Sequence, residues 1–123
     1  MNYDYELFFI ENFIIKSKRN RLFYELRNSK KRQNCLGRFC HHAEDLLDMQ
    51  KICDTQDFEK ILGNPECYIL AYNSELDKSQ CNLKQALKLV LGNGMSAIII
   101  GKNFAIIETE QCYSMPIRYF LKL

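Results

Sequence analysis

The chain has 123 residues, of which 47% are hydrophobic and 26% charged, and its formal net charge at pH 7 is +2. This composition is typical of a globular protein with one hydrophobic core, and it excludes a chain that is disordered by composition. We therefore expect a single domain over residues 1–123.

The first predicted element is a helix over residues 3–15. Tyr3, Leu7, Ile10 and Ile14 form one apolar stripe at helical spacing, and phenylalanines occupy other sides of the same segment. A helix that is apolar on most sides is either buried in the core or lies at a subunit contact. The first interpretation makes this a central core helix, and the second predicts a homodimer through it.

The remaining elements follow from apolar spacing, caps and turn residues. The second and third helices are either separated by a break at residues 27–29 or joined into one. In chain order we expect helices over 19–27 and about 30–50, a helical turn over 55–62, a strand over 67–72, a helix from Asn82 to Gly92 or Gly94, and strands over 96–100, 104–109 and 117–123.

Helices grouped first and strands grouped later indicate an α+β fold. We expect N-terminal helices, about three of them, packed on one face of a small, mostly antiparallel C-terminal sheet of about three or four strands with one further helix. The order is α-α-α-β-α-β-β-β.

No segment has the features of a membrane span or a secretory signal. The most apolar runs, at 7–15 and 96–108, are shorter than the roughly 18–20 residues that a spanning helix needs. Asp4 and Glu6 lie where a signal peptide carries positive charge. We therefore expect a cytoplasmic protein without membrane contact, whose six cysteines are reduced thiols.

Positive charge is concentrated between residues 16 and 38. That segment holds nine basic residues and one acidic residue, whereas the rest of the chain holds eight basic and fourteen acidic residues. Such a segment attracts phosphate backbones, and Tyr24 or Phe23 offers a ring for base stacking. The ordinary alternative is a set of solvated helix faces that pair with acidic faces of the same fold.

The start of the third helix gives a second reason to consider an anionic partner. Lys30, Lys31 and Arg32 fall in its predicted first turn, where positive charge opposes the helix dipole. An anion at this N-terminus would offset that cost. If the second and third helices are continuous, the cost does not arise.

Potential metal ligands are present but poorly arranged. Cys35, Cys40, His41 and His42 lie in one helical segment and point in different directions, so that they do not converge on a zinc ion. We expect no metal and no cofactor.

Catalytic patterns are equally weak. A nucleophilic pair of Cys112 with His41 or His42 requires the fold to bring distant residues together. Glu108 and Glu110 lie two apart on a strand, and we expect them to share a polar edge. The sequence therefore favours binding over catalysis.

The leading functional hypothesis is a non-catalytic module that binds another protein, such as a toxin-neutralising immunity protein or a small regulator. Binding of RNA or DNA through residues 16–38 is the alternative, and a small enzyme of unknown class is the second alternative. The predicted partner-binding residues are Lys16, Lys18, Arg19, Arg21, Arg27, Lys30, Lys31, Arg32, Arg38 and His41.

Overall fold

The computed structural model describes residues 3–55, 57–92, 96–109 and 118–123, and it describes the backbone but not the side chains of Cys40 and His41. Within these residues the chain forms one antiparallel sheet with the strand order β1-β6-β5-β4-β2-β3. The strands are β1 Ile52–Cys53, β2 Glu66–Ala71, β3 Gln80–Asn82, β4 Ala97–Ile100, β5 Phe104–Glu108 and β6 Arg118–Lys122.

The predicted α+β class and antiparallel sheet are confirmed, but the sheet is larger than expected, with six strands among the described residues. The two unpredicted strands, β1 and β3, form its edges and have two and three residues. Segments this short do not show the alternation of polar and apolar residues that identifies a strand in a sequence.

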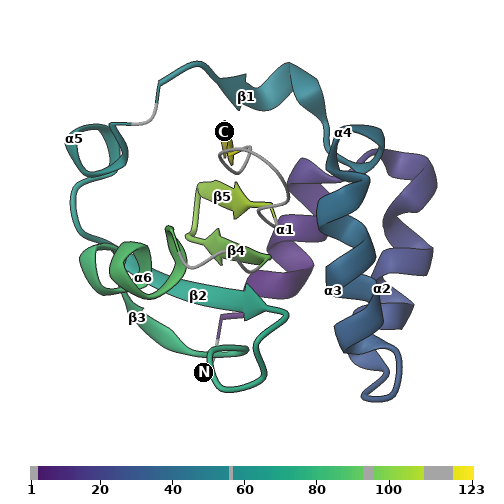
Figure 1. Cartoon of the computed structure of the whole chain (residues 1–123). Helices are drawn as coiled ribbons and strands as arrows, with labels where there is room; N and C mark the ends of the chain where they lie inside the picture. The colour runs from purple at the N-terminus through teal and green to yellow at the C-terminus, as the bar shows by residue number, and fades with distance from the viewer. Residues whose placement is uncertain (1–2, 56, 93–95, 110–117) are drawn as a thin grey trace.

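Helices cover both faces of this sheet. The predicted N-terminal helices lie together on one face, and α6 lies with α5 on the other (Figure 1). The helices are α1 Tyr5–Phe13, α2 Arg19–Arg27, α3 Arg32–His41, α4 Ala43–Leu46, α5 Phe58–Leu62 and α6 Leu83–Val90, with the 3-10 helices η1 Lys16–Lys18 and η2 Met49–Lys51. In the described part of the chain, no helix is both long enough and apolar enough to cross a bilayer.

The central strand β4 shows why polar and apolar residues do not alternate along the central strands of the sheet. All four of its residues are buried. Ile98 and Ile100 pack against the α1–α4 side, while Ala97 and Ile99 pack against the α5–α6 side. A strand covered on both faces has no polar face, so its sequence is a continuous apolar run.

The sequence left two interpretations of helix α1 open, a core helix and a homodimer contact, and the structure shows a core helix. Phe9, Ile10 and Phe13 are at most 2% exposed and pack against the sheet and the neighbouring helices. Leu7 and Phe8 remain half-buried. Little apolar surface of α1 is therefore left for a homodimer contact, which stays a prediction.

The connection after α2 and the predicted helix over about 30–50 differ from the expectation. The alternative prediction that α2 and α3 form one continuous helix is wrong, because Asn28 adopts an extended conformation that ends α2. The predicted helix over about 30–50 is divided at His42 into α3 and α4. The predicted cap of α6 is confirmed, since the Asn82 side chain accepts a hydrogen bond from the Gln85 N–H at 2.9 Å.

Candidate functional site

The predicted cations lie on η1, on α2, in the turn that follows and on α3, and α2 lies on the outer side of the helical layer (Figure 1). Nine of the ten predicted partner-binding residues have described side chains, and that of His41 lies outside the described residues. Eight of the nine are exposed or half-exposed, and Arg32 is buried. We call these eight the basic surface: Lys16, Lys18, Arg19, Arg21, Arg27, Lys30, Lys31 and Arg38.

The arginines of the basic surface are partly neutralised within the chain. Arg21 and Arg38 both pair with the nearly buried carboxylate of Glu25, the Arg21 contact being 3.1 Å long. Arg27 pairs with Asp4 at 2.7 Å. Eight cations are thus opposed by two bonded carboxylates, which leaves an excess of six positive charges.

The lysines of the basic surface differ from its arginines in their partners. Within the described residues, no carboxylate forms an ion pair with Lys16, Lys18, Lys30 or Lys31. The Lys31 ammonium lies 5.2 Å from the centre of the Tyr24 ring. Tyr24 is 58% exposed, so a large aromatic side chain lies among these charges.

Arg32 joins three parts of the fold. Its guanidinium is held between Glu6 of α1, at 3.0 and 2.9 Å, and Asp77 of the loop after β2, at 2.6 and 3.0 Å. The fifth N–H donates to the carbonyl of Leu26 at 2.9 Å. All five guanidinium donors are therefore used inside the protein.

Arg32 is neutralised by the carboxylates that it binds. Lys30 and Lys31 lie in the turn before α3, and Arg32 is the first residue of the helix. Glu6 and Asp77 therefore offset the positive charge of one of the three basic residues that were expected in the first turn. An anionic partner at this helix N-terminus stays a prediction.

Tyr68 completes the buried network. Its hydroxyl donates a hydrogen bond to Glu6, and burial together with the Glu6 charge raises the pKa of Tyr68 above its usual value. The phenol therefore stays protonated and acts as a donor. Among the described residues, every buried side-chain nitrogen or oxygen has a hydrogen-bond partner.

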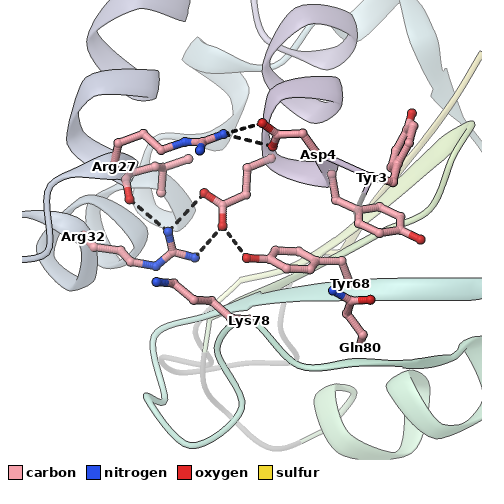
Figure 2. A pocket seen from close by; sticks show the side chains of 10 residues that line it. Tyr3, Asp4, Arg27, Arg32, Tyr68, Lys78 and Gln80 are labelled. Carbon is pink, nitrogen blue, oxygen red and sulfur yellow. Dashed lines mark hydrogen bonds and ion pairs between the residues drawn. The ribbon is translucent and has the colours of Figure 1, made fainter. Parts of the chain in front are cut away.

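A hollow of about 410 Å³ adjoins this network, between the start of α1, the end of α2 and the β2–β3 loop (Figure 2). Tyr5 and Tyr68 stack in its wall with ring centres 5.5 Å apart. Lys78, at its rim, has a φ of +69°. The Lys78 N–H donates to Ile69, whose own N–H donates to Ser79, so two residues of the loop face one residue of β2. The unusual backbone of Lys78 belongs to this bulge, which directs Asp77 towards Arg32.

A second hollow of about 350 Å³ lies between α2, α3 and α4. Its apolar lining is formed by the buried Leu22, Cys35 and Phe39 and the half-buried Leu46. Its polar lining contains three residues of the basic surface together with Glu25, His42 and Asp45. We call it the helical hollow.

Cys35, in the lining of the helical hollow, is not an activated nucleophile. Burial raises the pKa of Cys35 to about 11, with a further contribution from Glu25, so the thiol stays protonated at neutral pH. A nucleophilic cysteine requires the opposite shift. No group of three or more potential metal ligands is found among the described residues.

The prediction that Glu108 and Glu110 form an exposed polar edge is wrong for Glu108. Its side chain is fully buried, bonds the Arg118 guanidinium at 2.8 Å and accepts a hydrogen bond from the Gly92 N–H at 3.1 Å. A buried carboxylate needs such partners because leaving it unpaired is costly. Glu110 and Cys112 lie outside the described residues.

Sequence reasoning missed Glu6, Asp77 and Tyr68 as partners of Arg32. A local signal existed for Glu6, which lies three and four residues before the buried Phe9 and Ile10 and therefore on the same helix face. A carboxylate on an apolar face predicts a buried cation nearby. Asp77 lies 45 residues from Arg32, and no local pattern joins them.

Comparison with family models, with curated proteins and with solved structures finds no match to this chain.

Proposed function

We propose that this chain is a non-catalytic module that docks an acidic surface of another protein through its basic surface. The observation that carries the proposal is the group of exposed lysines without carboxylate partners among the described residues, at Lys16, Lys18, Lys30 and Lys31. Charges that serve only solubility are usually mixed in sign, whereas charges of one sign steer a complementary partner.

A protein partner is favoured over nucleic acid by the charge of the molecule as a whole. Outside residues 16–38 the chain carries eight basic and fourteen acidic residues. A long polyanion would meet this acidic remainder, while a protein interface of ordinary size covers only one part of a small domain.

The surroundings of Tyr24 also favour a protein partner over nucleic acid. The Lys31 ammonium covers part of its ring, which reduces the area on which a base stacks. Tyrosine and arginine side by side combine two of the residue types that are enriched among the residues that dominate protein interfaces. Arg21 and Arg27, three residues to either side on α2, provide that combination.

A pull-down from the native host tests the proposal, with the wild-type chain and Lys30→Glu/Lys31→Glu as baits and with and without nuclease. The matched control is Lys84→Glu/Lys88→Glu, which makes the same charge change at exposed positions of α6 on the opposite face. We expect a nuclease-resistant protein that the wild type and the control retain and the Lys30/Lys31 variant loses.

Two results would overturn the proposal. Loss of the captured material on nuclease treatment would assign the surface to nucleic acid, and equal recovery by both charge variants would remove the basic surface from the interface. Direct binding to single-stranded RNA that falls steeply between about 50 and 200 mM salt would support the nucleic-acid alternative.

Within this proposal, a toxin-neutralising or regulatory role is the specific form that we expect, in the cytoplasm. The free thiols of Cys35, Cys53, Cys67 and Cys81 are compatible with a reducing compartment. Mass spectrometry of the protein purified from its host with rapid alkylation would reveal a disulfide if the compartment is oxidising.

A further inference from the structure

We propose that the helical hollow receives one large apolar side chain from an acidic segment of the partner. This inference depends on the proposed function and specifies the chemistry of the partner at one point of the interface. It is carried by a hollow with an apolar floor whose rim carries three of the cations of the basic surface: Lys18, Arg21 and Arg38.

The floor of the hollow is suited to an aliphatic or aromatic group. Leu22, Cys35 and Phe39 are between 2% and 6% exposed, and Leu46 of α4 closes one side. The volume, about 350 Å³, is at the small end of the range for ligand pockets. It therefore fits a single anchoring side chain better than a cofactor, and interface anchors commonly fill hollows of this kind.

The rim is suited to carboxylates. The side chains of Arg21 and Arg38 are 76% and 54% exposed, although both are held by Glu25. Of the five donors on each guanidinium, Arg21 uses one and Arg38 two in bonds to described residues. Since both side chains are exposed and each already bonds to Glu25, an incoming carboxylate meets two guanidinium groups that a shared carboxylate holds at the rim.

The acidic groups at the hollow restrict how a segment binds. Glu25 is already shared by two arginines, and Asp45 lies on the α4 side. A carboxylate of the partner is repelled by Asp45 and attracted by Lys18 and Arg21 of the η1–α2 side. The acidic residues of the segment should therefore lie over α2, with the apolar residue pointing between α3 and α4.

A selection from random displayed peptides of about twelve residues tests this directly, because it requires no knowledge of the natural partner. We expect the selected peptides to combine Asp or Glu with a Leu, Ile, Phe or Trp. Replacing that apolar residue of a selected peptide by Ala should weaken binding about tenfold or more. Selected peptides without acidic residues, or an Ala variant that binds as well as its parent, would overturn the proposal.

A variant that fills the hollow gives an independent readout. Leu46→Trp adds bulk inside the hollow without changing its charge. The matched control is Ile61→Trp, at an exposed side chain of α5. We expect Leu46→Trp to weaken peptide binding about tenfold or more and Ile61→Trp to leave it within about twofold. Equal effects of the two variants would place the peptide elsewhere and overturn the proposal.

A second measurement applies if Leu46→Trp does not fold. Peptide is added to the wild type and the chemical-shift changes are mapped onto the chain. We expect changes at Leu22, Phe39 and Leu46, and their absence at these residues would overturn the proposal.

The test separates this inference from the proposed function. Loss of binding in Lys30→Glu/Lys31→Glu with no effect of Leu46→Trp would support an acidic partner and remove the hollow from the interface. A dimer of the free protein in sedimentation that Leu46→Trp dissociates would assign the hollow to a second copy of the chain and overturn the proposal.

Discussion

The buried network around Arg32 allows a quantitative prediction of stability. Replacing Arg32 by Met keeps an apolar stem of similar length but removes five hydrogen bonds to Glu6, Asp77 and the Leu26 carbonyl. The side chains of Arg32 and Glu6 are each 8% exposed, so the two carboxylates lose their counter-charge where water reaches them poorly. Removing one partner of a buried ion pair costs about 3–5 kcal/mol. That is at least a fifth of the roughly 5–15 kcal/mol that stabilises an ordinary domain.

Urea denaturation followed by far-ultraviolet circular dichroism measures this change, since the chain has no tryptophan for fluorescence. At an m-value of about 1.5 kcal/mol/M, the midpoint of Arg32→Met should fall by about 2–3 M urea. Arg27→Met is the control, because the side chains of Arg27 and Asp4 are each 45% exposed. An exposed pair of this kind contributes about 0–1 kcal/mol. Equal and small losses in the two variants would refute the assignment of Arg32 as the central connection of the fold.

Three further predictions address other positions. Gly101→Ala should lower the unfolding free energy by about 1–3 kcal/mol in urea denaturation, because an added Cβ would lie 2.0 Å from the ring of the buried Phe104; unchanged stability would contradict this packing. Cys35 should resist alkylation at about pH 8 until the protein is unfolded, because burial raises its pKa to about 11; peptide mass mapping that finds rapid labelling of the folded protein would show the thiol to be accessible. Partial burial alone would raise the pKa of Asp4, but hydrogen bonds from the Leu7 N–H and the Arg27 guanidinium outweigh this effect and lower the pKa. The unfolding free energy of the wild type should therefore exceed that of Asp4→Asn, which retains the N-cap, by about 0.3–1 kcal/mol at neutral pH. This difference should decline as the pH falls through the unfolded-state pKa of about 3.9 and be lost once the pH is also below the lower folded-state pKa; a difference that persists under still more acidic conditions would refute the charge argument.

Elements with strong local signals were predictable from the sequence. Helix α2 occupies Arg19–Arg27, the same residues as expected. Helix α6 begins after the expected cap and buries the expected stripe, including Leu83, Ala86 and Val90. In both segments the helical period or the cap chemistry lies within one continuous stretch, so no distant contact is needed to recognise it.

What the sequence did not predict depends on contacts between distant residues. Strand β1 exists because Ile52 and Cys53 pair with β6, nearly seventy residues later. No proline or glycine lies at the break between α3 and α4 at His42, so the sequence carries no local signal for it. The partners of Arg32 come from α1 and from the loop after β2. The site was therefore predictable as a concentration of charge, whereas the structural role of its members was not.

Arginine and lysine divide two tasks within the basic segment. Each arginine there donates from its guanidinium to a carboxylate or, for Arg19, to the carbonyl of Ile14 at 2.9 Å. The lysines have no such carboxylate partner among the described residues. This division follows from chemistry, because a planar guanidinium bridges several fixed acceptors, whereas an ammonium is a strongly hydrated point charge on a flexible stem. The arginines therefore hold α1, α2 and α3 in place, and the lysines supply the long-range field that an acidic partner would meet first. Charge reversal at the lysines should consequently affect association far more than folding.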